Sequence, residues 1–159
     1  MPRPTPPRAA AAADVLALDR QLCFALYAAS LAMTKLYKPL LEPLGLTYPQ
    51  YLVMLALWQD DGQGVGQLGE RLSLDSGTLT PLLKRLEAAG LVQRLRDAGD
   101  ERRVRVQLSV AGRALKARAR GVPLRLAQAS GCTLDEIAPL TQRLQALREQ
   151  ITRSTPAAA

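Results

Sequence analysis

The chain has 159 residues, a formal net charge of +7 and no histidine. This length fits one compact domain or one subunit of a larger assembly, and a hydrophobic content of 48% excludes a wholly disordered protein. The absence of histidine excludes histidine-dependent catalysis and the usual zinc-finger ligand sets. We therefore expect neither a metal ion nor another cofactor.

The amino end is rich in proline and alanine, and its longest apolar run is five alanines, too weak for a secretory signal. No stretch has the ~20 continuous apolar residues that a membrane-spanning helix needs. Two cysteines, Cys23 and Cys132, are too few for a disulfide scaffold and fit a reducing compartment. We expect residues 1–13 to be a disordered tail and the protein to be cytoplasmic.

The first helix is predicted over Val15–Leu36. Apolar residues recur there at steps of three or four, and the segment has neither glycine nor proline. Residues that break helices follow and should end it, namely Pro39, Pro43 and Gly45.

A second helix is predicted to begin after Thr47. Gln50 stands three residues further on, the spacing of a capping box, and Pro49 falls in the first turn, where proline is tolerated. The turn-forming residues 60–62 should end this helix.

Two short helical patterns joined by a tight turn come next. Val65–Leu72 and Gly77–Ala89 each carry leucines on one stripe, and Ser73–Ser76 separate them. Either Asp75 or Ser76 can cap the second helix. Helix, short turn and helix in this order form the helix-turn-helix layout.

The sequence then changes to the alternation typical of strands. Leu91–Arg96 and Arg102–Val110 are predicted strands, and the turn-forming residues 97–101 join them. The residues expected on the apolar face of the second strand are Val104, Val106, Leu108 and Val110. A basic β-hairpin directly after a helix-turn-helix is a wing. The predicted fold class is therefore mainly α with a small β-hairpin wing, a winged helix-turn-helix.

The last third returns to helix, from Ala111 to about Leu126 with an interruption at residues 121–123, and again after a capping box of Thr133 and Glu136. Apolar residues of the final helix follow heptad steps, namely Ile137, Leu140, Leu144, Leu147 and Ile151. This narrow seam fits an interface between helices, with an ordinary core helix as the alternative. Pro139 should kink the first turns.

The positive charge is concentrated in about a quarter of the chain. Residues 84–125 contain 12 basic and 4 acidic residues, a local charge of +8, whereas the other residues contain 9 basic and 10 acidic ones, which sum to −1. A one-sided basic region is typical of a protein with a polyanion partner, with an incidental basic surface as the alternative.

This layout predicts contacts with double-stranded DNA. The start of the second helix reaches base edges, basic residues further along suit phosphates, and arginines at the hairpin tip suit a narrow minor groove. The candidates are Asp75, Ser76, Thr78, Thr80, Lys84, Arg85, Arg102 and Arg103. Capping and helix solvation are the alternative for the small polar residues. An ion pair with Asp100 or Glu101 is the alternative for the two wing arginines.

Motifs at Leu22–Tyr27, Tyr37, Leu46–Tyr51, Asp75–Lys84 and Asp100–Arg102 extend over nearly the whole chain. Together they resemble the OhrR-type organic hydroperoxide sensors, a branch of the MarR winged-helix repressors. The resemblance implies a transcriptional repressor that is not an enzyme. It also implies a homodimer that binds palindromic operator DNA and responds to organic hydroperoxide.

The resemblance also implies roles for thiols and tyrosines. It implies that Cys23 reacts with peroxide, that Tyr37 and Tyr48 of the partner subunit donate hydrogen bonds to it, and that Cys132 forms an intersubunit disulfide with it. Tyr27, one turn from Cys23, can share its face. Tyr37 follows Cys23 by 14 residues, roughly 21 Å along a straight helix, so contact needs a bend or the other subunit. A lone cysteine on an apolar helix is usually a small packing residue, and this is the alternative for Cys23.

The expected organisation is a winged helix-turn-helix at residues 47–110 and a helical dimerisation region formed by residues 14–46 and 111–153. Residues 154–159 are a second tail. Three other functions stay open at this point. They are a repressor released by a small aromatic ligand, with structural cysteines; a thiol peroxidase; and a constitutive architectural DNA-binding protein.

Overall fold

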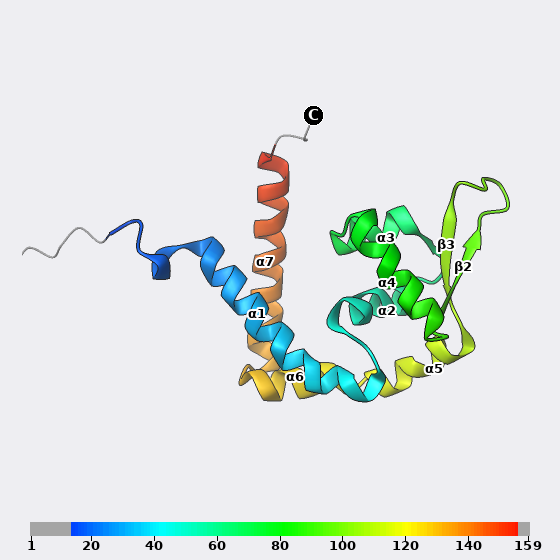
Figure 1. Cartoon of the computed structure of the whole chain (residues 1–159). Coiled ribbons are helices and arrows are strands. Elements are labelled where there is room, and N and C mark those ends of the chain that lie inside the picture. Colours follow the sequence, from blue (N-terminus) through cyan, green and yellow to red (C-terminus); the bar gives the residue numbers. More distant parts are fainter. Residues whose placement is uncertain (1–13, 156–159) are drawn as a thin grey trace, which may run out of the picture. The chain divides into compact units, whose positions relative to one another are not determined.

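The structure is a computed structural model that describes residues 14–155 (Figure 1). The tail predicted at residues 1–13, and residues 156–159 of the second predicted tail, lie outside the described residues. Contacts within the described residues form two compact units, which divide between Lys35 and Leu36. The second unit contains a helix-turn-helix followed by a β-hairpin, which confirms the predicted fold class.

The first unit contains a 3-10 helix, Leu18–Arg20, and the start of helix α1, Leu22–Leu41. The predicted helix start at Val15 is therefore wrong. The Asp14 carboxylate accepts a hydrogen bond from the N–H two residues further on at 3.0 Å, and Gln21 Nε2 donates to the Val15 carbonyl oxygen at 2.8 Å. These local side-chain bonds compete with helix and favour turns before Leu22.

The end of α1 also differs from the prediction. The helix passes through Pro39 and ends at Leu41, in the second unit. Pro39 lacks the N–H that would bond to the preceding turn, but Leu40 and Leu41 are buried there. Burial of a leucine side chain contributes about 1.5–3 kcal/mol, so two of them offset the cost of the proline.

Helix α2, Tyr48–Gln59, follows a 3-10 helix at Glu42–Leu44. The predicted capping box is confirmed, since the Thr47 N–H donates to Gln50 Oε1 at 2.9 Å and the Gln50 N–H donates to Thr47 Oγ1 at 3.4 Å. This helix supplies the middle of the hydrophobic core, with its buried residues being Tyr51, Val53, Met54, Ala56 and Leu57.

Helices α3, Val65–Leu72, and α4, Ser76–Ala88, form the predicted helix-turn-helix. Gly69 allows the turn to pack tightly, because a Cβ at this position would stand 2.8 Å from the Leu74 carbonyl oxygen. Ser73 has a φ of +56°, a left-handed conformation that closes the turn. The spacing of α3 and α4 is therefore fixed by backbone contacts as well as by buried leucines.

The wing is a three-stranded antiparallel sheet in the order β1–β3–β2. Strands β2, Val92–Arg96, and β3, Val104–Leu108, form the predicted hairpin. Strand β1, Gln63–Gly64, precedes α3 and was not predicted. Because β1 pairs with β3, the sheet connects the start of the helix-turn-helix to the wing.

Helices α5, Val110–Ala119, and α6, Val122–Ser130, follow the sheet with a break near the predicted residues 121–123. Helix α5 begins directly after β3, because Ser109 caps it: the Ser109 Oγ accepts from the Gly112 N–H at 3.0 Å. Val110 is therefore not on the apolar face of the strand, as expected, but is an exposed residue of α5.

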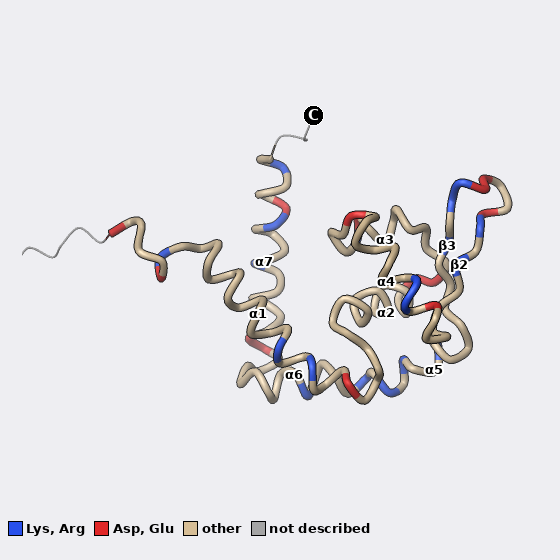
Figure 2. Tube along the Cα trace, in the orientation of Figure 1, with Lys and Arg blue, Asp and Glu red and all other residues tan. Residues whose placement is uncertain are grey.

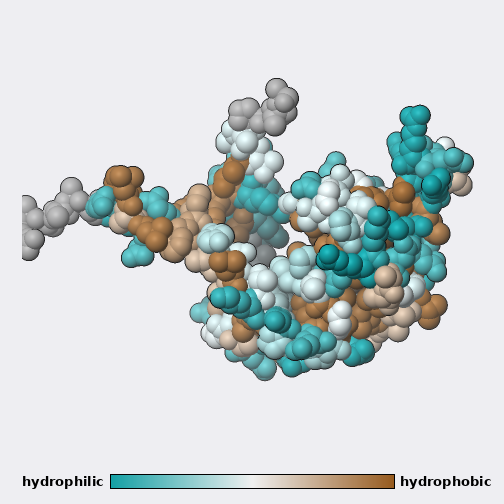
Figure 3. All heavy atoms as spheres, viewed as in Figure 1, coloured by the Kyte–Doolittle hydropathy of each residue, from teal (hydrophilic) through white to brown (hydrophobic). Residues whose placement is uncertain are grey.

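Helix α7, Leu134–Ser154, starts at the predicted capping box and continues through Pro139. None of its residues is buried, so within the described part of the chain it is not a core helix. Figure 3 shows brown, hydrophobic atoms on the surface of this helix. The exposed large hydrophobic residues of α7 are Leu134, Leu140, Leu144 and Ile151.

Candidate functional site

The first turn of α4 is open to solvent. The Asp75 carboxylate accepts a hydrogen bond from the Thr78 N–H at 2.8 Å, so Asp75 is the cap of this helix. The side chains of Ser76 and Thr78 are exposed and Thr80 is half-buried. Capping thus accounts for Asp75, whereas Ser76 and Thr78 are available to a ligand outside the chain.

A cleft of about 570 Å³ opens between the start of α3, α4 and the wing. It brings together three residues expected at a DNA interface, Thr80, Arg102 and Arg103. Two further arginines line it that sequence reasoning missed, Arg94 of β2 and Arg105 of β3. Strand alternation was the available signal, because Arg105 alternates with the buried Val106 and must face away from the core.

Lys84 and Arg85 lie further along α4 and are both exposed. Figure 2 shows positive and negative residues together on the wing and positive residues along α5. The interface predicted from the sequence therefore divides into exposed cations on α4 and a wing in which charges of both signs meet.

Glu87 of α4 holds the wing through Arg94. Its carboxylate accepts from the Arg94 backbone N–H at 2.9 Å and from the Arg94 Nε at 2.8 Å. These two hydrogen bonds lower the pKa of Glu87 below its usual value. The contact fixes β2 against the second helix of the helix-turn-helix.

The ion pair considered as an alternative for the two wing arginines is present at Arg103. The Arg103 Nε lies 3.5 Å from the Asp100 carboxylate, whereas Arg102 contributes only its backbone N–H to Asp100, at 3.0 Å. The alternative therefore applies to Arg103, whereas within residues 14–155 the Arg102 side chain forms no ion pair and the tip turn uses its backbone. Arg105 pairs with Asp97 at 3.0 Å, and hydrogen bonds from the Gly99 N–H and Arg105 lower the pKa of Asp97.

Two of the tyrosines expected beside a reactive thiol lie together. The rings of Tyr37, near the end of α1, and Tyr48, at the start of α2, have centroids 4.6 Å apart. Burial, with the neighbouring Tyr48 and Tyr51, raises the pKa of Tyr37 to about 12, and burial also raises the pKa of Tyr48. Both phenols therefore stay protonated at neutral pH and can donate hydrogen bonds.

Tyr51 completes this cluster and was missed as part of it. Its ring centroid lies 5.8 Å from that of Tyr37, and its side chain is almost fully buried. The third tyrosine proposed from the sequence, Tyr27, lies in the first unit and is exposed.

Both cysteines are free and exposed. Cys23 is the second residue of α1, and its neighbours Leu22 and Phe24 are exposed as well. Packing inside the chain therefore does not explain this cysteine. Cys132 lies between α6 and α7, where its N–H donates to the Ser130 Oγ at 3.4 Å.

Metal-binding clusters and membrane-spanning helices were sought among the described residues. Within residues 14–155, no group of three or more acidic, cysteine or histidine side chains is placed to hold a metal ion. No helix of the same range is both long and apolar enough to cross a membrane.

Comparison with known proteins gives consistent matches. The family described as transcriptional regulator SarA/Rot matches residues 35–119. The chain is 50% identical over 127 residues to the organic hydroperoxide resistance transcriptional regulator of Bacillus subtilis. This match covers 78% of this chain and 86% of that protein. It is also 50% identical over 138 residues to the HTH-type transcriptional regulator TtmR of Methylorubrum extorquens, covering 87% of this chain and 71% of that protein.

Solved structures of AbfR from Staphylococcus epidermidis share the fold. Reduced AbfR bound to DNA is 32% identical, with a TM-score of 0.69 and coverage of 86% of this chain and 93% of that chain. Overoxidised AbfR bound to DNA is 35% identical, with a TM-score of 0.68 and coverage of 84% and 94%. Disulfide-formed AbfR is 37% identical, with a TM-score of 0.58 and coverage of 82% and 91%.

Proposed function

The chain belongs to the MarR/SarA family of transcriptional regulators, and from this premise we propose a more specific function. It is a redox-sensing repressor whose homodimer binds palindromic operator DNA when reduced and leaves it when an organic hydroperoxide oxidises Cys23. Two relatives support the proposal. One is named for organic hydroperoxide resistance, and the other has been solved on DNA in its reduced and overoxidised forms and also in a disulfide-formed state.

One observation carries the proposal. The Tyr37 and Tyr48 rings lie side by side, half-buried, and their hydroxyls make no hydrogen bond within residues 14–155. Two protonated phenols without partners can donate to an anion, and a thiolate that accepts such bonds is favoured over the thiol. Because Cys23 and Tyr37 are separated by roughly 21 Å along a straight helix, the thiolate is supplied by the other subunit.

The chemistry follows from the thiolate, which is the nucleophilic form of cysteine. The sulfur of Cys23 attacks the peroxide oxygen, a sulfur–oxygen bond forms and the oxygen–oxygen bond breaks. The departing alkoxide takes up a proton as an alcohol, and Cys23 becomes a sulfenic acid. The Cys132 thiol of the partner subunit then attacks that sulfur, forming a disulfide and releasing water. A cellular thiol reductant restores both thiols.

DNA release follows from the geometry of a dimer. Residues 47–110 are the DNA-binding part in this proposal, and two copies of α4 must fit half-sites about 34–36 Å apart. Cys132 lies directly after α6, so forming the disulfide displaces this helix and, through it, α5. A rigid-body shift of a few ångströms then prevents both recognition helices from fitting at once.

The dimerisation region in this proposal consists of residues 14–46 and 111–153. Helix α7 has an exposed apolar seam that includes Leu140, Leu144 and Ile151. Contiguous apolar surface of this kind is typical of an interface, and the spacing suits packing against another helix. A second copy of the chain covers it.

The decisive experiment combines mass spectrometry of the hydroperoxide-treated protein with an operator gel shift on the same sample. We expect oxidation at Cys23 together with loss of the shifted band, and neither change in Cys23→Ser. Equal release of DNA by wild type and Cys23→Ser would exclude redox sensing through this residue. Many turnovers of hydroperoxide per protein would instead indicate a thiol peroxidase.

A second experiment tests the role of Cys132. After treatment with peroxide, the wild type should give a dimer band on a non-reducing gel that a reductant removes. Cys132→Ser should give no such band. A monomer band from the oxidised wild type would contradict the two-cysteine mechanism and leave the role of Cys23 intact.

A further inference from the structure

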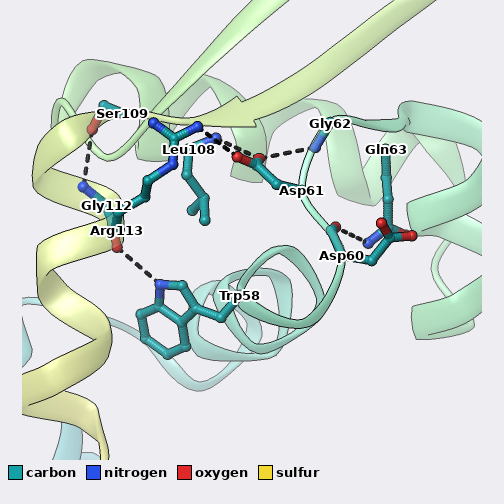
Figure 4. A network of polar contacts seen from close by, with 9 residues as sticks. All are labelled: Trp58, Asp60, Asp61, Gly62, Gln63, Leu108, Ser109, Gly112 and Arg113. Carbon is teal, nitrogen blue, oxygen red and sulfur yellow. Dashed lines mark hydrogen bonds and ion pairs between the residues drawn. The ribbon is translucent and has the colours of Figure 1, made fainter.

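Asp61 connects three elements of the second unit (Figure 4). One carboxylate oxygen accepts from the Gly62 N–H and from the Leu108 N–H, both at 2.8 Å. The other oxygen accepts from the Arg113 guanidinium at 2.7 Å. Although desolvation alone would raise the pKa of Asp61, the hydrogen bonds from Leu108, Arg113 and Gly62 lower it below its usual value. The carboxylate therefore joins the end of β3 to the first turn of α5.

A second contact ties the same turn of α5 to α2. The Trp58 Nε1–H donates to the Gly112 carbonyl oxygen at 2.9 Å, and the Lys116 Nζ donates to the Trp58 carbonyl oxygen at 2.9 Å. Helix α5 is thus fixed to α2 along one full turn. Figure 4 shows Trp58 and Asp61 approaching α5 from the same side.

The start of α5 has no room to slide past the wing. Ser109 donates through its N–H to the Leu91 carbonyl oxygen at 3.0 Å and through its Oγ to the Gly90 carbonyl oxygen at 2.6 Å. At Gly112, an added Cβ would stand 2.0 Å from the Leu91 oxygen. A movement of α5 is therefore passed to the residues that lead into β2, because the backbones are in direct contact.

We propose that the Asp61–Arg113 ion pair transmits a displacement of α5 to the end of β3, in addition to the backbone contacts between α5 and the residues before β2. Arg113 and Asp61 are positioning residues, since neither lines the cleft between α4 and the wing. When α5 moves, Arg113 pulls the Asp61 carboxylate, which also holds Leu108 at the end of β3. The inference rests on the proposed function, in which oxidation displaces α6 and α5.

The test compares DNA affinity before and after oxidation in matched variants. Asp61→Asn keeps an acceptor for the Leu108 N–H and removes the charge that holds Arg113. Asp60→Asn is the control, because it makes the same charge change one residue away and the Asp60 carboxylate has no hydrogen bond or ion pair within residues 14–155. The probe is a fluorescent duplex selected from a random pool by the reduced wild type, and the oxidant is cumene hydroperoxide.

We expect oxidation to weaken DNA binding by wild type and by Asp60→Asn at least about fivefold, the lower end of ordinary allosteric coupling. In Asp61→Asn this ratio should fall to less than about half of the wild-type value, while the reduced protein binds within about threefold of wild type. The Arg113→Gln variant and the double variant should match Asp61→Asn, since the two residues act as one contact.

The outcomes separate this inference from the proposed function. A merely structural role for the pair would weaken binding in both redox states and leave the ratio of the two affinities unchanged, which would overturn the inference alone. If the wild type itself shows no change on oxidation, the proposed function fails and the inference fails with it. A lowered ratio in Asp60→Asn as well would assign the effect to charge and overturn the role of the ion pair.

Discussion

The close approach of α5 to the wing makes Gly112→Ala a sharp test of the packing. An alanine methyl would stand 2.0 Å from the Leu91 carbonyl oxygen and 3.3 Å from Leu108 Cδ2. Because a carbon–oxygen contact needs about 3.3 Å, the two backbones must separate by more than ~1 Å. That separation disturbs two hydrogen bonds, from the Ser109 N–H to Leu91 and from Trp58 to Gly112.

The expected free-energy change follows from these contacts. Forced overpacking costs ~1–3 kcal/mol, and each disturbed hydrogen bond costs ~1 kcal/mol. The better helix propensity of alanine opposes this by ~1 kcal/mol. The net expectation is a loss of ~2–4 kcal/mol in the free energy of unfolding.

Urea unfolding followed by circular dichroism measures this loss, with the protein concentration held constant because association contributes to stability. Gly66→Ala is the control, since Gly66 lies in the first turn of α3 and a Cβ there meets nothing within 4 Å. It should be neutral or stabilising by up to ~1 kcal/mol. Unfolding of Gly112→Ala at or above the wild-type midpoint would refute the contact at α5.

Three further predictions concern the thiol, the wing and the Asp61 carboxylate. Tyr37→Phe should slow the oxidation of Cys23 by cumene hydroperoxide tenfold or more, since a hydrogen bond to a charged group contributes ~1.5–3 kcal/mol. Stopped-flow thiol titration measures this rate, and an unchanged rate would exclude a hydrogen bond from Tyr37 to the thiolate. Arg102→Ala should lower the slope of log affinity against log salt by about 1; an unchanged slope would place Arg102 away from phosphate. The pKa of Asp61 in the folded protein is lowered from its usual value of 3.8. The ionised carboxylate therefore stabilises the folded state at a pH above 3.8, and this stabilisation is lost as the pH falls through the lowered pKa. The stability difference between wild type and Asp61→Asn should therefore shrink as urea unfolding is repeated toward about pH 3, and a constant difference would contradict this.

The sequence predicted the elements whose signals are local. Thr47 with Gln50, and Asp75 before α4, act over three residues, and the structure has these caps where they were expected. Alternation of apolar residues identified the hairpin for the same reason, because it needs no knowledge of distant partners. The start of α1 was missed because the side chains of Asp14 and Gln21 satisfy the backbone in another way.

Contacts between distant residues were beyond such reasoning. Strand β1 has two residues, too few for a pattern, and exists because β3 pairs with it. The Asp61–Arg113 pair joins residues 52 apart, and the Trp58–Gly112 bond joins residues 54 apart. Of the candidate site, the sequence identified the tyrosines through family resemblance, whereas their 4.6 Å approach depends on how α1 and α2 pack.

The ion pairs of the wing and of the first turn of α5 decide which cations remain for DNA. Carboxylates occupy the side chains of Arg94, Arg103, Arg105 and Arg113. A paired guanidinium must share its charge between carboxylate and phosphate, so it releases fewer counterions when DNA binds. Arg102, Lys84 and Arg85 have no carboxylate partner within residues 14–155. The paired arginines therefore set the shape of the wing and its distance from α4, and the unpaired cations supply most of the electrostatic affinity that the proposed repressor needs.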